Sequence, residues 1–97
     1  MKEKLQPKVG RPRGAKTFDP APALAFGAIV RRIRLKKAIS QEELANLANV
    51  ERSHMGKIER GEHLPNLILI LKIANALSIS AAKLIERTEK QLIETNY

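Results

Sequence analysis

The chain has 97 residues, with 18 Lys and Arg against 10 Asp and Glu, which gives a formal net charge of +8 at pH 7. This length allows one modest domain, and two His, no Cys and no clustered carboxylates leave no set for a catalytic or metal site. No segment approaches the roughly 18 apolar residues of a membrane-spanning helix, and no signal peptide is apparent. We therefore expect a cytoplasmic protein that is not an enzyme, holds no cofactor or metal and does not enter a membrane. Its charge favours a polyanion as partner, above all nucleic acid.

Residues 1–18 predict a flexible basic arm. In the first 16 residues six Lys and Arg stand against one Glu, and two Pro and two Gly interrupt any periodicity. Such a segment cannot bury enough apolar surface to order itself. Its motif GRPRG at positions 10–14 resembles the core of an AT-hook, which implies that Arg11 and Arg13 enter the minor groove of A·T-rich DNA. The open alternative is a solvated tail that only adds phosphate contacts.

Apolar residues at helical spacing, together with capping residues, predict five helices and no strand after Asp19. Ser40 with Glu43 has the form of a capping box, in which each side chain bonds the backbone amide of the other residue. Gly61 stands where a glycine commonly ends a helix. The fifth helix either extends to the C-terminus or frays after about Arg87. In residue numbers, the predicted helices span 19–37, 41–48, 51–60, 67–77 and 81 to at least 87.

The apolar spacing also predicts which side of the fourth helix is buried. On the core side we expect Leu67, Ile70, Leu71, Ala74 and Leu77. Four other apolar residues are expected on the surface, where the arm, the C-terminal segment or a second subunit would cover some of them: Leu35, Leu47, Ile68 and Leu69.

The order and spacing of residues 40–77 carry a resemblance to a known family. The matching residues are Ser40-Gln41-Glu42-Glu43-Leu44-Ala45, Val50, Arg52-Ser53, Ile58-Glu59-Arg60-Gly61, Pro65, Leu67 and Ile73-Ala74-Asn75-Ala76-Leu77. They resemble the helix-turn-helix domain of the phage repressor and Cro family, also called the XRE family, and the likeness extends over about residues 24–85. It implies an all-α, compact five-helix lambda-repressor-like domain, in which residues 51–60 form the helix that enters the major groove.

That helix and its surroundings supply candidate DNA contacts. Arg52, Ser53 and Lys57 point away from its apolar stripe and are expected to contact base edges, with Arg52 paired bidentately to guanine. A phosphate contact is the alternative for Arg52, and Lys57 is open between base edge and phosphate. Gln41 resembles the glutamine with which the family binds a backbone phosphate. The expected phosphate-binding residues are Gln41, His54, Arg60 and His63.

Further positions concern how that helix is held. Arg34 and Glu59 match positions that form a salt bridge between the first and third helices in the resembling proteins, which implies a structural role. Gly56 costs helix stability of about 1 kcal/mol relative to Ala, and both a close approach to DNA and a neutral surface glycine are open explanations. Glu51 stands where a Ser or Thr usually caps the helix, so the helix start could be shifted.

We divide the chain into the arm (1–18), a DNA-binding domain (19–87) and a C-terminal extension (88–97) that could contact a second subunit or a partner. The leading hypothesis is a sequence-specific transcriptional regulator, a repressor that binds a palindromic operator on double-stranded DNA as a homodimer, through the fifth helix and residues 86–97. One alternative is an antitoxin that autoregulates its operon, with a toxin as protein partner. Transcription machinery is the other candidate protein partner. An architectural chromosome protein, which needs little base recognition, is the third hypothesis. Under each of the three hypotheses we expect this protein to act at the prokaryotic nucleoid.

Overall fold

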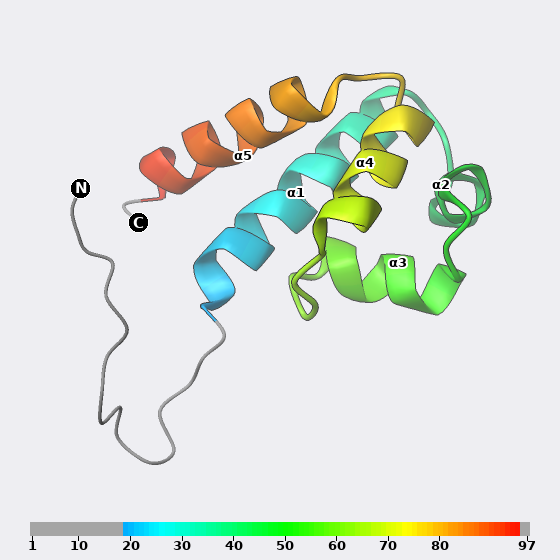
Figure 1. Ribbon diagram of the computed structural model, residues 1–97, viewed down its shortest axis with the longest axis horizontal. Helices are drawn as coiled ribbons and strands as arrows, with labels where there is room; N and C mark the ends of the chain where they lie inside the picture. The colour runs from blue at the N-terminus through cyan, green and yellow to red at the C-terminus, as the bar shows by residue number, and fades with distance from the viewer. Residues whose placement is uncertain (1–18, 96–97) are drawn as a thin grey trace, which may run out of the picture.

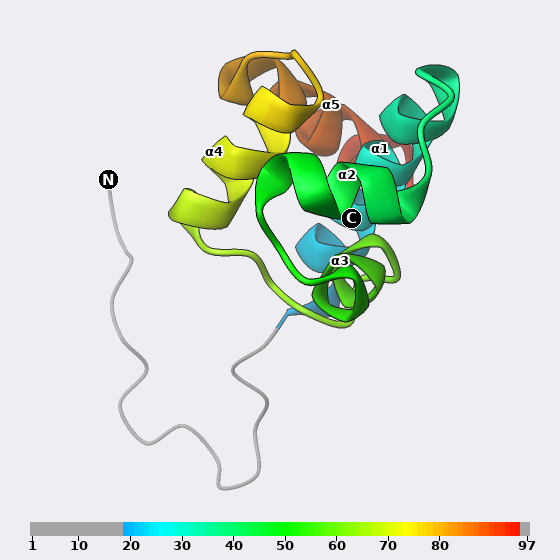
Figure 2. The ribbon, with the colours of Figure 1, turned by 90° about the vertical axis from the view of Figure 1, so that its right-hand side faces the viewer.

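The computed structural model describes residues 19–95, so the predicted arm lies outside the described residues. The described chain folds into five helices and no strand, which confirms the all-α prediction. The helices are α1 (Pro20–Lys36), α2 (Gln41–Ala48), α3 (Arg52–Glu59), α4 (Leu67–Ala76) and α5 (Ala81–Glu94). In Figure 1, α5 runs alongside α1, and α3 lies on the opposite side of the bundle from α5. Figure 2 shows α2 lying above α3.

Side-chain caps fix the start of four helices. Ser40, Asn66 and Ser80 each accept a hydrogen bond from the amide three residues later, at 2.9, 2.9 and 3.0 Å. Asp19 Oδ1 accepts one from the amide two residues later at 3.1 Å. These bonds satisfy amides that have no partner inside the helix. Only half of the predicted capping box forms in the described chain, since the amide of Ser40 donates no bond to Glu43.

The core gathers aliphatic side chains from all five helices, together with one Phe. Burying them removes apolar surface from water, which is the main favourable term in folding. Helix α5 continues to Glu94 without fraying after Arg87, so the segment predicted as an extension begins inside this helix. The largest fully buried side chains are Val30, Leu44, Met55, Ile58, Ile73, Leu77 and Leu84.

The buried face predicted for α4 is partly wrong. Leu69, expected on the surface, is buried, and it shares the core side with Ile73 and Leu77. Leu67 and Leu71, expected in the core, are 68% and 51% exposed. The first five residues of α4 are all apolar, so periodicity alone could not select its face, and packing against α2 and α5 decided it. Among residues 19–95 no single helix is long and apolar enough to cross a membrane; α4 and α5 pass that test only together, and they are bent by 104° at their junction.

The close approach of α1 and α3 depends on Gly27. A Cβ at this position would overlap the backbone oxygen of Ile58 and lie 2.7 Å from that of Glu59. Backbone atoms inside a helix cannot turn aside as the end of a flexible side chain can. Gly27 therefore sets the distance between the two helices.

Candidate nucleic-acid interface

A three-residue turn joins α2 to α3. Asn49 adopts the left-handed conformation at φ 58°, and the amide of Val50 donates to the oxygen of Ala45 at 2.9 Å. Val50 packs partly buried against the core. Glu51 is the N-cap residue of α3, and the helix begins at Arg52. The side chain of Glu51 makes no capping hydrogen bond. The first amides of α3 consequently lack a side-chain acceptor.

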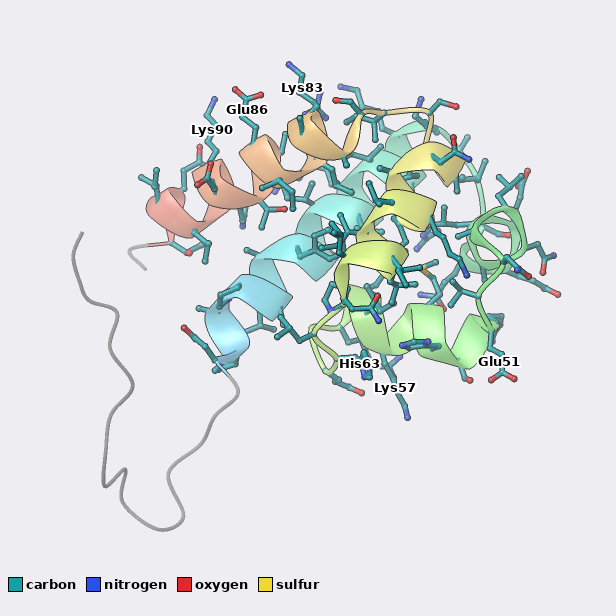
Figure 3. The ribbon with its side chains drawn as sticks, viewed as in Figure 1. Glu51, Lys57, His63, Lys83, Glu86 and Lys90 are labelled. Atoms are coloured by element: carbon teal, nitrogen blue, oxygen red, sulfur yellow. The ribbon has the colours of Figure 1, made fainter. Side chains whose placement is uncertain are left out.

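The outer side of α3 carries a stripe of polar side chains. Met55 is buried, whereas Ser53, Lys57 and Arg60 are exposed. These three follow one another at i+4 and i+3, which places them on one side of a helix. Lys57 points away from the bundle in Figure 3. Arg52 is also exposed, in the first turn and about 100° around the axis from Ser53.

A buried ion pair ties α3 to α1. Arg34 donates from Nε to Glu59 Oε2 at 2.6 Å and from Nη2 to Oε1 at 3.0 Å, and the two side chains are 9% and 2% exposed. The remaining Nη1 of Arg34 donates to the backbone oxygen of Ile39 at 3.0 Å. Two parallel bonds between guanidinium and carboxylate fix orientation as well as distance. This pair therefore holds the C-terminal half of α3 in one position on α1.

Gln41 lies across α3 and joins this network. Its Nε2 donates to Glu59 Oε1 at 3.0 Å. A Cβ on Gly56 would come within 3.3 Å of Gln41 Oε1 and 3.1 Å of Arg60 Nη1. Gly56 is thus buried beneath two side chains and is not a neutral surface glycine. A side-chain amide has two N–H bonds, so the second one on Gln41 can still donate to a phosphate.

Arg60 forms an exposed ion pair that we did not predict from the sequence. Its Nε and Nη2 donate to the two carboxylate oxygens of Glu62 at 2.8 and 3.2 Å. The hydrogen bonds from Arg60 lower the pKa of Glu62, and the same bonds raise the pKa of Arg60. Both groups are therefore charged at neutral pH. To bind a phosphate as predicted, Arg60 would have to exchange or share this carboxylate.

His54, in the first turn of α3, contacts His63 of the loop that follows the helix. The rings of His54 and His63 lie edge to face, with centroids 4.6 Å apart. The Nε2 atom of His54 is buried and has no hydrogen-bond partner in the described part of the chain. His63 is exposed and lies on the same side of the molecule as Lys57 in Figure 3. Of the two His residues predicted to bind phosphate, His63 is the more exposed.

Within residues 19–95, the residues predicted to contact DNA lie on α3 or next to it. A short helix with an exposed polar side, preceded by a second helix that crosses it, fits the width of the major groove. Arg11 and Arg13 lie outside the described residues. The fold and this surface define a DNA-binding protein of the helix-turn-helix class. The residues brought together are Gln41, Arg52, Ser53, His54, Lys57, Arg60 and His63.

Known proteins share this domain. The helix-turn-helix family model HTH_3 matches residues 30–84. The control protein C.BamHI of Bacillus amyloliquefaciens is 41% identical over 66 residues, which are 67% of this chain and 82% of that protein. The restriction-modification controller protein C.AhdI from Aeromonas hydrophila has 42% identity and a TM-score of 0.64, over 66% of this chain and 97% of its own. The controller protein C.Esp1396I, solved as a tetramer with its natural 35 base-pair operator, has 25% identity and a TM-score of 0.69, over 74% of this chain and 95% of its own.

This chain belongs to the helix-turn-helix family, of the XRE or phage repressor and Cro type that its motif indicated. The matched region begins within α1 and ends within α5, so it includes the whole of the surface described above. The chain is a DNA-binding transcriptional regulator.

Proposed function

We propose that this regulator represses transcription by binding a palindromic operator as a homodimer, in the cytoplasm at the bacterial nucleoid. The observation that carries the proposal is the polar stripe of α3, held rigidly on α1 by the Arg34–Glu59 pair. The operator complex of the similar protein C.Esp1396I supports an operator as the target. Nothing in the similar proteins favours an antitoxin.

Helix α3 supplies the base contacts in this proposal. Arg52 pairs with guanine O6 and N7, and Ser53 and Lys57 contact neighbouring base edges from the exposed stripe. Contacts to phosphate fix the register of the protein on the duplex without specifying sequence. They come from Gln41, Arg60 and His63, while His54 supports His63 through the ring contact.

A second copy is proposed to cover the exposed side of α4. Three large aliphatic side chains of α4 lie there at i, i+1 and i+4, a spacing that places them on one side of a helix, and an exposed leucine of the loop before the N-cap precedes them. Exposed apolar side chains gathered on one side of a helix favour an interaction surface, and a two-fold axis through it would match a palindromic site. The sequence had favoured the fifth helix and residues 86–97, yet α5 exposes only Ile85 and Ile93 as large apolar side chains among its described residues. The α4 stripe consists of Leu67, Ile68 and Leu71, which are 68%, 65% and 51% exposed, and Leu64 in the preceding loop is 53% exposed.

Matched substitutions test the α4 stripe. Ile68→Glu places a charge in the proposed interface, whereas Leu35→Glu places one at a similarly exposed leucine of α1 (51%). In sedimentation equilibrium we expect Ile68→Glu to be monomeric at concentrations where the wild type and Leu35→Glu are dimeric. Its operator affinity should fall about tenfold or more, because one half-site then binds alone. A dimeric Ile68→Glu variant would rule out this interface and leave the proposed DNA contacts of α3 untouched.

Selection of bound sequences from a pool of random duplexes tests the operator. The full chain is expected to enrich an inverted repeat whose half-sites lie roughly one helical turn apart, about 34–36 Å centre to centre. Enrichment of a lone half-site would contradict the homodimer. If the chain binds random duplexes as tightly as the selected ones, its binding is not sequence-specific, and an architectural protein is favoured.

A further inference from the structure

Two open cavities of about 320 and 460 Å³ meet beside the contact between α1 and α5. They share Ile33, Lys36 and Arg87, so together they form one continuous furrow. Lys90, which lines it, and Lys57 of α3 lie on opposite sides of the bundle in Figure 3. The furrow is therefore separate from the DNA-binding surface. We call it the basic furrow, after the five cations that line it: Arg32, Lys36, Lys37, Arg87 and Lys90.

The charge of the basic furrow is not balanced by the residues around it. Glu94 is the one carboxylate among the described residues that line the two cavities. Within residues 19–95 none of the five cations has a carboxylate at ion-pair distance. Arg32 donates from Nη2 to the neutral Gln91 at 3.4 Å. Five like charges held together repel one another, and a bound anion would relieve that repulsion.

The helix dipole accounts for only part of this arrangement. Lys36 and Lys37 lie at the C-terminal end of α1, where a cation is stabilised by the unpaired carbonyl groups. Arg87 and Lys90 lie inside α5 and gain nothing comparable from its ends. Their position opposite the α1 cations gives the furrow two charged walls.

The floor between those walls is apolar. Ile29 and Ile33 are buried beneath it, and Ile79 is partly buried. We propose that the basic furrow binds an acidic peptide segment of a partner protein, with carboxylates on the two walls and an apolar side chain over the floor, while α3 holds DNA. Charge complementarity favours this occupant, since Arg and Lys pair well with carboxylates. A second duplex could supply charge, but it has no apolar side chain to place between two helices.

A defined peptide tests this proposal on the full chain. The probe is a fluorescein-labelled 12-residue peptide of Glu with Leu at every third position, measured by anisotropy at about 0.15 M salt. We expect Arg87→Glu and Lys36→Glu, both at exposed positions, each to weaken binding about tenfold. The control Arg31→Glu reverses an exposed cation of α1 that lines neither cavity, and it should change affinity less than about twofold. Circular dichroism checks that each variant is folded. Because Lys36 and Arg87 lie on different helices, one furrow variant still tests the proposal if the other does not fold.

Three results would overturn the proposal. Equal losses in Arg31→Glu and the furrow variants would mean that the peptide senses only the net charge. Equal affinity for a peptide with Ser in place of Leu would mean that the apolar floor plays no part. A furrow variant that loses affinity for a non-specific duplex while it keeps affinity for the peptide would assign the furrow to nucleic acid. Operator binding by α3 should survive the substitutions in the furrow, so failure here leaves the proposed repressor function standing.

Discussion

Two glycines in the middle of helices show how two regions of the molecule differ. Gly27, where α1 meets α3, faces backbone oxygens of the neighbouring helix. Gly56, on α3, faces the ends of the flexible side chains of Gln41 and Arg60. An added methyl group has nowhere to go at the first position, whereas at the second position the neighbours can move by a few tenths of an ångström.

The two regions have different roles: the junction with α1 positions α3, and the outer stripe of α3 is the side proposed to contact DNA. The junction with α1 has tight packing and a buried ion pair, and these fix where the helix lies. The outer stripe has exposed side chains that can adapt to a duplex. Substitutions at the junction should therefore lower the stability of the fold, and substitutions on the stripe should change DNA affinity while the stability stays unchanged.

Gly27→Ala is expected to have the largest effect on the junction. The new Cβ overlaps backbone atoms of Ile58 and Glu59, so α1 and α3 must separate, at a cost of about 3 kcal/mol or more in the free energy of unfolding. Urea denaturation followed by circular dichroism measures this loss. The matched control is Gly56→Ala, which should leave stability unchanged or raise it by up to about 1 kcal/mol. Equal stability of the two variants would mean that the junction is not the rigid region.

Glu59→Gln is expected to have an effect of about the same size. The substitution leaves the buried guanidinium of Arg34 without its counter-charge, which costs about 3 to 5 kcal/mol in the free energy of unfolding. A variant with Met at both Arg34 and Glu59 should recover much of that loss, because no unpaired charge remains. Thermal unfolding compares them, with Glu62→Gln as the same change in an exposed pair, expected to leave the melting temperature close to that of the wild type. A similar small loss for Glu59→Gln would show that this ion pair does not hold the helix.

Arg52→Ala tests the exposed first turn of α3, which lies beside the stripe. It should cost about 1 to 3 kcal/mol of affinity for the selected operator and little for a scrambled duplex, with thermal stability unchanged. Lys83→Ala, on α5 at the far side of the molecule in Figure 3, is the control and should alter neither affinity. Titration of labelled duplexes with each variant provides the comparison. An equal loss on both duplexes would assign Arg52 to a phosphate.

The sequence predicted the helices because their signals are local. Ser40, Asn66 and Ser80 each bond an amide three residues later. This fixed spacing can be recognised in the sequence. Gly61 has φ 76° directly after α3, as a glycine at a helix end should. The motif likewise placed the candidate DNA contacts, because the family fixes them at positions along the chain.

The faces and partners of side chains were harder to predict because they depend on tertiary contacts. Five consecutive apolar residues open α4, so the periodicity could not say that Leu69 would be buried and Leu67 exposed. The bond from Gln41 to Glu59 joins residues 18 positions apart, and no local pattern indicates it. The pair of Arg60 with Glu62 was detectable from opposite charges two residues apart, at the point where the helix ends.

Glu62→Gln is expected to have the smallest effect. It tests whether the exposed stripe of α3 can adapt to a duplex, as the α1–α3 junction cannot. Removing the carboxylate frees Arg60 from its exposed ion pair, so the guanidinium can turn to a phosphate without exchanging partners. Affinity should rise roughly two- to fivefold on operator and scrambled duplex alike, since an exposed ion pair is weak and is screened by solvent. The fall of log K with log salt should steepen by up to about 0.9, the value for one added phosphate contact. Glu86→Gln removes a carboxylate of α5 that is paired with Lys83, and it controls for the change in net charge. If both variants tighten binding equally, Arg60 gains nothing from its release and the adaptable part of the surface is confined to Ser53 and Lys57.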